Sequence, residues 1–415
     1  MRTQHMKHFY QANKINVIAL CIFFILILTG CWDYTEYEDM LLINAIGIDI
    51  EPNENDITLT IAYPRTSPSV EKSKPGGSSE GEIKDIVFTA YGKTIPEAVD
   101  HMQQMMSREI FLGYTSIVIV GKKAAIAHIE KILNYIDTSP TMRMSSRIIV
   151  TPGKASDLLS IVNTYEEKSV SNSLNEIFNT TEDTGATFPI MLKDFYSALS
   201  IEGYEPVAST VSVKKLITQK NEVQNETHQG MIKRFEGEVE IDGLALFNGF
   251  KLVGWLNAKE SRGWGLIMNK KVQDFTSIHV SEKEYLTYRI LKNTSKTKVH
   301  IDDDLSIDVN INVKCSIDEL NLTDDFNDPA VVQKIEESIA AAIKENVEAT
   351  VRKVQKEIRA DVFGMGFQTF RQYPREWNQF YKTHWKDIFP NIPIHIHVEA
   401  KVLHTGYINE PLQEQ

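Results

Sequence analysis

One stretch near the C-terminal end of the chain restricts the fold more than any other. From residue 305 to residue 318 apolar and polar side chains alternate without a break, in the sequence LSIDVNINVKCSID. Because successive side chains of a β-strand point to opposite faces, this pattern predicts one long strand with one buried face. Cys315 falls on the apolar face, where we expect a buried, unreactive thiol.

A long helix is predicted directly after this strand. Asp328 can cap it, and Pro329 suits its first position. Apolar residues then recur every three or four positions from Val332 to Ile358, which makes one apolar stripe along a helix. Residues 392–402 alternate again and predict another strand. For residues 270–415 we therefore expect an α+β domain with long curved antiparallel strands packed on one long helix.

The preceding sequence alternates between strand-like and helical runs. We expect an N-terminal α/β domain over residues 31–165, with a mixed sheet, and a smaller α+β domain over residues 166–269. Proline, glycine and serine dominate residues 64–82, which we expect to form a mobile loop. The polar residues 165–187 are expected to connect the two domains. Asn248-Gly249 is a strong signal for a hairpin turn. The fold class is thus α+β, with three mixed α/β domains.

The first thirty residues differ from the rest of the chain. They contain no Asp or Glu, and three basic residues precede the apolar run VIALCIFFILIL. This layout is typical of a secretory signal, and the run is short for a membrane-spanning helix. The signal ends Leu-Thr-Gly-Cys31, which resembles the bacterial lipobox, so we predict diacylglyceryl modification of Cys31. The alternative is an uncleaved signal anchor with an incidental cysteine.

The charge balance and the cysteine content argue against nucleic-acid binding and against an intramolecular disulfide. The chain has 44 basic and 56 acidic residues. Removing residues 1–30 removes three basic residues, so the mature chain has a net charge of 41 − 56 = −15. Nucleic-acid binding needs a basic surface, and this balance argues against it. With Cys31 acylated and Cys21 removed, only Cys315 remains as a thiol, so we expect no intramolecular disulfide.

Motifs for catalysis are weak. The phosphate-loop and HExxH patterns are absent, and the GxSxG match at residues 77–81 lies in a polar linker rather than between a strand and a helix. His395, His397 and Glu399 share one face of a predicted strand and could hold a metal, but a polar solvent face is the preferred interpretation. We expect no cofactor, no catalytic residue and no metal site.

Two further groups have a structural and a functional interpretation. Residues 302–304 are three consecutive aspartates, which suit a solvated turn or a cation site. Trp255 and Trp264 flank a region with Arg262 and suit either core packing or stacking on a ligand. The structural interpretation is preferred for both groups.

Several motifs, in order along the chain, resemble the Ger(x)C family, the C-subunit lipoproteins of nutrient germinant receptors in endospore-forming bacteria. The similarity runs from Cys31 to about Gly406 and rests on these segments: CWDYTEYED from residue 31, LINAIGID from 42, SREIFLG from 107, GLALF from 243, KLVGWL from 251, DVFGMG from 361, and Tyr373-Pro374, Trp377 and Trp385. The chain departs from the family pattern at residues 138–143, where only Pro140 and Arg143 match the charged segment of many relatives.

The resemblance implies a three-domain α+β lipoprotein on the outer face of the inner spore membrane, anchored in the lipid bilayer through diacylglyceryl-Cys31. It implies two integral membrane partners, one of them transporter-like, and no catalytic site. It leaves open which nutrient triggers germination and whether this subunit contacts it. Two other functions fit the sequence less well: a solute-binding lipoprotein of an importer, and a surface metal-dependent hydrolase that uses His395, His397 and Glu399.

Overall fold

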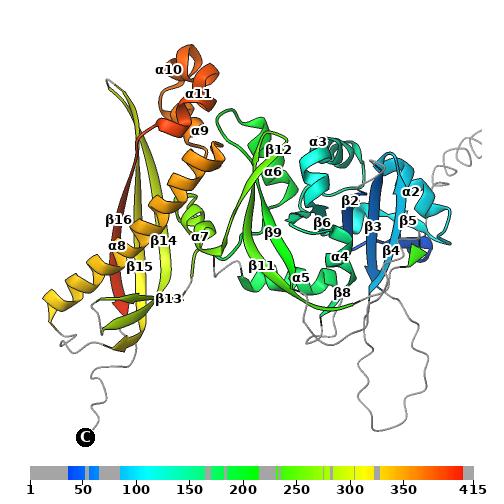
Figure 1. The fold of residues 1–415 in the computed structure, drawn as a ribbon, viewed down its shortest axis with the longest axis horizontal. Helices are drawn as coiled ribbons and strands as arrows, with labels where there is room; N and C mark the ends of the chain where they lie inside the picture. Colours follow the sequence, from blue (N-terminus) through cyan, green and yellow to red (C-terminus); the bar gives the residue numbers. More distant parts are fainter. Residues whose placement is uncertain are drawn as a thin grey trace, which may run out of the picture.

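Two β-sheets, lying end to end, organise the molecule (Figure 1). The computed structural model describes residues 36–51, 56–64, 85–163, 170–181, 185–214, 230–231, 235–273, 275–280, 284–302, 304–321 and 328–404. The predicted signal segment, Cys31, the GxSxG match and almost the whole loop predicted at residues 64–82 lie outside these residues. Among the helices within them, none has both the length and the apolar character to cross a membrane.

The larger sheet is mixed, as the sequence predicts. Its strand order is β10-β4-β3-β2-β6-β7-β9-β11-β12, and β8 pairs with β11. The strands are β2 (Ala45–Ile50), β3 (Ile57–Pro64), β4 (Asp85–Gly92), β6 (Ile117–Gly121), β7 (Arg147–Thr151), β8 (Ile161–Asn163), β9 (Val207–Lys214), β10 (Gly230–Met231), β11 (Phe235–Asn248) and β12 (Lys251–Leu256). Strands on both sides of residue 165 therefore belong to one continuous sheet.

Helices cover both faces of this sheet. They are α2 (Ile95–Gln103), α3 (Lys122–Thr138), α4 (Ala155–Ser160), α5 (Val170–Thr181) and α6 (Leu192–Ser200). In β6, Val118 and Val120 pack in the core that contains α3, whereas Ile117 and Ile119 pack in a second core with α4 and α5. Burial on both faces explains why the central strands are apolar at nearly every position.

The polar stretch 165–187, expected to connect two domains, contains a helix among its described residues. Residues Val170–Thr181 form helix α5, whose Leu174 and Phe178 are buried. The guanidinium of Arg147 donates to the Asn179 side chain at 2.8 Å and lies over the Phe178 ring. Few apolar residues of this segment face the sheet, so its sequence is mostly polar. The helix is held in place by contacts with residues distant in the sequence.

The smaller sheet forms the C-terminal unit. Its order is β13 (Phe275–His279), β14 (Tyr285–Ile301), β15 (Leu305–Asn321) and β16 (Ile394–His404). The alternation in β15 is confirmed, because its apolar residues are buried against helix α8 (Pro329–Lys353), which Asp328 caps by accepting from the Ala330 N–H at 2.9 Å. The first three strands are antiparallel, as predicted, but β16 runs parallel to β15. The long crossover through α8 returns the chain to the same end of the sheet, and a parallel strand requires such a connection.

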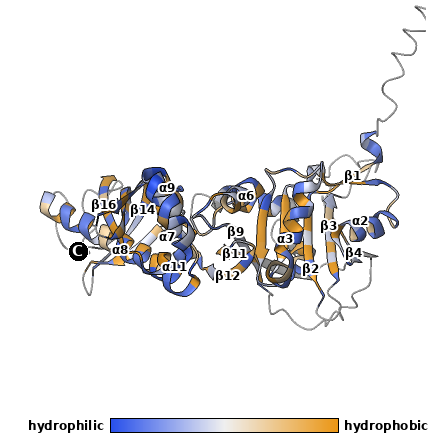
Figure 2. Cartoon of the chain, turned by 90° about the horizontal axis from the view of Figure 1, so that it is seen from above, coloured by the Kyte–Doolittle hydropathy of each residue, from blue (hydrophilic) through white to orange (hydrophobic). Residues whose placement is uncertain are grey.

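Two groups of helices lie between the sheets. Helix α7 (Ala258–Ile267) follows β12 and packs on α8. Its Trp264 is buried and donates from Nε1 to the Val362 carbonyl at 2.9 Å, which confirms core packing for this tryptophan. Helices α9 (Met365–Gln372), α10 (Pro374–Glu376) and α11 (Lys382–Ile388) lead from the end of α8 to β16. In Figure 2, hydrophobic residues concentrate on the strands and on the helix faces that cover them.

Candidate functional site

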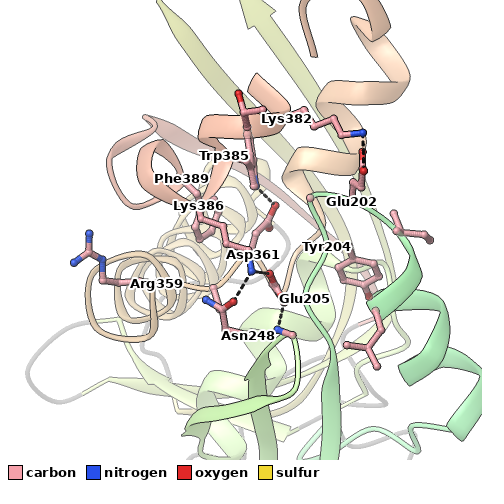
Figure 3. A pocket seen from close by; sticks show the side chains of 16 residues that line it. Glu202, Tyr204, Glu205, Asn248, Arg359, Asp361, Lys382, Trp385, Lys386 and Phe389 are labelled. Atoms are coloured by element: carbon pink, nitrogen blue, oxygen red, sulfur yellow. Dashed lines mark hydrogen bonds and ion pairs between the residues drawn. The ribbon is translucent and has the colours of Figure 1, made fainter. Parts of the chain in front are cut away.

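A hollow of about 340 Å³ lies where the two units meet. Four segments line it: the chain between α6 and β9, the β11–β12 turn, residues 359–361 between α8 and α9, and the region of helix α11 (Figure 3). The first two belong to the large-sheet unit and the last two to the C-terminal unit. We call this contact region the joint.

Asp361 lies at the centre of the joint. It is 3% exposed, and its carboxylate accepts from the backbone N–H groups of Met365 and Gly366 at 3.0 and 2.8 Å, and from Trp385 Nε1 at 3.0 Å. Its backbone carbonyl accepts from the Glu205 N–H at 2.9 Å. Asp361 therefore caps helix α9, holds helix α11 and ties the C-terminal unit to the large-sheet unit.

A close approach of two glycines completes the contact. Gly203 has φ +72°, and a Cβ there would lie 2.6 Å from the Trp377 ring and 2.7 Å from the Gly366 Cα. The Phe367 N–H donates to the Gly203 carbonyl at 3.1 Å. Both the left-handed backbone and the lack of space require glycine at position 203.

Charged side chains at the rim pair across the joint. Lys386 Nζ lies 3.0 Å from Glu205 Oε1 and donates to the Asn248 side chain at 2.7 Å. Lys382 Nζ lies 2.7 Å from Glu202 Oε1. Exposed ion pairs contribute less than about 1 kcal/mol each, so these pairs orient the two units more than they stabilise them.

The ionisable groups of the joint have shifted pKa values. Burial raises the pKa of Asp361 to about 7 from an ordinary value of 3.8, and hydrogen bonds from backbone N–H groups and Trp385 offset part of this rise. Burial likewise raises the pKa of Tyr204 to about 12. A raised carboxyl pKa means that the folded protein binds a proton that the unfolded chain has already released.

This shift predicts a pH-dependent stability. Between about pH 4 and pH 7 the free energy of unfolding should fall as the pH rises, more steeply in the wild type than in an Asp361→Asn variant. Urea unfolding at several pH values in this window measures both slopes. Asp49, whose pKa is also raised by burial, is common to both proteins, so the difference between the slopes isolates Asp361. Parallel slopes would contradict the assignment.

Among the described residues, the candidate metal and cation ligands identified in the sequence lie on the surface, apart from the lining of the joint. His395, His397 and Glu399 are exposed on β16, and no group of three or more potential metal ligands occurs in the described part of the chain. Asp302 and Asp304 are exposed, and Asp303 lies outside the described residues. These side chains do not approach the joint.

Cys315 behaves as the sequence predicts. Its side chain is fully buried as a free cysteine. Burial raises the pKa of its thiol to about 12, so the thiol stays protonated at neutral pH. A protonated, inaccessible thiol is unreactive.

Two motifs of the family resemblance turn out to share one structural role. Asp49, in the AIGID segment, accepts from the N–H groups of Ala155 and Ser156 at 2.8 and 2.9 Å and so caps α4. Asp361, in the DVFGMG segment, does the same for α9. Gly203 and Glu205, which complete the joint from a distant part of the chain, belong to neither motif. No local sequence pattern indicated that they contact the segment around Asp361.

The fold and the joint define a class of protein: an α+β protein of two sheet-based units joined through a buried aspartate. The family description "Spore germination protein N-terminal domain" matches residues 33–213, and "Spore germination B3/GerAC like, C-terminal" matches residues 242–406. The crystal structure of the GerBC protein matches 86% of this chain and 96% of its own, at 18% identity and a TM-score of 0.52.

Relatives in Bacillus subtilis (strain 168) match along almost their whole length. The chain is 26% identical to spore germination protein KC, over 97% of this chain and 98% of the relative. It is 23% identical to spore germination protein B3, over 96% and 99%. The chain belongs to the Ger(x)C family of spore germination proteins, as its motifs indicate.

Proposed function

We propose that this protein is a lipid-anchored subunit of a spore germinant receptor and is required for nutrient-triggered germination. It acts by assembly with two integral membrane subunits, one of them transporter-like, at the outer face of the inner spore membrane. The observation that carries the proposal is the match to both family descriptions together with full-length similarity to spore germination proteins. The division into domains 31–165, 166–269 and 270–415 is kept as part of this proposal.

The start of the described chain supports anchoring at one end. Glu36 is the first described residue, five positions after Cys31. Five residues reach at most about 18 Å when fully extended. Diacylglyceryl-Cys31 would therefore hold the end that carries β1 (Met40–Leu42) close to the bilayer.

The chemistry of the joint supports a role in assembly rather than catalysis. The Asp361 carboxylate accepts from backbone and indole N–H groups, and Lys382 and Lys386 pair with glutamates of the other unit. A general acid or base must have a site free for a substrate proton. These side chains instead use their hydrogen-bonding capacity to hold the two units together.

Cys31→Ala tests the anchor. We expect the variant to lose lipid labelling, because no acceptor for the diacylglyceryl group remains, and to be released more readily than the wild type when membranes are washed at high salt. In a strain that lacks the gene, the wild-type copy should restore dipicolinate release in response to one nutrient class. The Cys31→Ala copy should restore this release only weakly. Fractionation, labelling with radioactive palmitate and dipicolinate release measure these effects.

Cys315→Ala is the matched control, since it removes the other cysteine of the mature chain and leaves the lipobox intact. It should label and fractionate like the wild type. Palmitate labelling of Cys31→Ala equal to that of the wild type would sink the anchoring proposal. The receptor function would be refuted if spores that lack this gene and the related receptors still germinated with every nutrient.

A further inference from the structure

One face of the C-terminal sheet is open. Helix α8 lies against β16 and shares one hydrophobic core with the apolar face of β15, and the polar side chains of the alternating pattern occupy the other face. Residues directly opposite each other on neighbouring strands share a face. The register therefore brings these exposed side chains together on one surface, which we call the open face: Lys292, Thr294, Lys296, Lys298, Asn310, Asn312, Lys314, His395, His397 and Glu399.

The open face is basic in an acidic protein. Lys292, Lys296, Lys298 and Lys314 all lie on it, against the acidic Asp308 and Glu399, which gives +2 before any histidine is protonated. The whole chain carries −12, so the remainder carries −14. None of the four lysines has an ion-pair partner within the described ranges, so their charges face solvent.

Histidines add to this surface. His300 Nε2 lies 3.0 Å from one oxygen of Asp308, and His397 Nε2 lies 4.0 Å from the other. The Asp308 carboxylate thus lies between two histidines, and its charge of −1 is already included in the +2. The result is a broad cationic surface built from three strands.

An exposed aromatic side chain borders the lysines. Phe275 is 56% exposed and pairs with Arg289, which pairs in turn with Ser316, so it lies on the open face. The Arg289 guanidinium carbon lies 5.1 Å from the centroid of the Phe275 ring. An exposed aromatic ring beside clustered cations is typical of proteins that bind the surface of a membrane.

We propose that the open face docks on an anionic phospholipid bilayer. The face is an uncovered sheet surface, which suits an extended lipid surface, and its charge is complementary to anionic headgroups. Each lysine near such a surface contributes measurably, and the effects add. A nucleic acid carries the same charge, and the acidic remainder of the chain repels both. The bilayer is the occupant we propose because the anchor of the proposed function would hold it within reach.

The proposal rests on the lipid anchor of the proposed function, which would keep the bilayer within reach. A tether raises the local concentration of the surface it faces, so a weak electrostatic contact is sufficient. With one end held by Cys31 and the C-terminal unit held by the open face, the body would lie along the bilayer instead of rotating about its tether.

The test uses the mature chain from residue 31 with Cys31→Ser, so that binding cannot come from the anchor. We expect it to sediment with vesicles of phosphatidylglycerol and phosphatidylcholine, not with phosphatidylcholine alone, and to be released by salt. Combining K292E, K296E, K298E and K314E should weaken vesicle binding on the order of 100-fold or more.

The matched control combines K122E, K123E, K131E and K193E, which change the net charge equally on exposed positions of α3 and α6. It should keep most of the vesicle binding, and near-ultraviolet circular dichroism checks that both variants are folded. Equal loss in both variants, undiminished binding of the open-face variant, or no binding of the parent chain to anionic vesicles would each overturn the proposal. Failure here leaves the Cys31→Ala result untouched, because that experiment keeps the open face intact.

Discussion

Replacing Asp361 by alanine should lower the free energy of unfolding by about 3–5 kcal/mol. The substitution leaves three donors without their acceptor in a buried site: the N–H groups of Met365 and Gly366, and Nε1 of Trp385. It also removes the cap of α9 and the link to α11. Urea unfolding monitored by tryptophan fluorescence is suited to this measurement, since Trp377 and Trp385 pack next to the site.

Asp387→Ala is the control for this experiment. Asp387 is exposed and belongs to helix α11, which Asp361 holds through Trp385. Its replacement also removes an aspartate carboxylate, but from the surface, and should change stability by less than about 0.5 kcal/mol. If the two variants were equally stable, the structural role assigned to Asp361 would be wrong.

Gly203→Ala should be the second most damaging substitution, at about 3 kcal/mol or more. The added methyl group meets the Trp377 ring and the Gly366 backbone, neither of which has room to move within the joint. The two units should therefore separate more readily. Hydrogen exchange at Phe367, whose N–H donates to the Gly203 carbonyl, should become faster in the variant.

Gly249→Ala separates the two causes of this effect. Gly249 also has positive φ, at +56°, but nothing lies within 4 Å of an added Cβ. Gly249→Ala should lower the free energy of unfolding by only about 1 kcal/mol, because a residue with a side chain is strained in the left-handed conformation. Equal destabilisation by the two substitutions would mean that the close contact with Gly366 contributes nothing.

Local patterns predicted the C-terminal unit well. The alternation that begins at Leu305 and the helical stripe that begins at Val332 each report directly which side chains are buried. The Asn248-Gly249 turn was equally explicit, and Gly249 has the expected positive φ. Each of these features is determined by residues close together in the sequence.

Features that depend on distant partners were not predicted. The direction of β16 follows from the path of the chain through α8, which an alternating pattern does not contain. Helix α5 is held by Arg147 of β7. The joint combines Gly203 with Gly366, and Glu205 with Asp361, which are more than 150 residues apart in the sequence. The AIGID and DVFGMG motifs contain Asp49 and Asp361, but the motifs alone do not show which residues these aspartates contact.

The continuous large sheet has a consequence for how the protein is made. Strand β9 is paired on one side by β7 and on the other by β11, and these partners precede and follow it in the chain. During synthesis from the N-terminus one edge of β9 stays bare until the chain has been completed to residue 248, and a bare edge recruits strands from other chains. A fragment that stops at residue 213 would keep this edge permanently. The shortest N-terminal piece with a covered β9 must extend through β11, past the start of the region matched by the C-terminal family description.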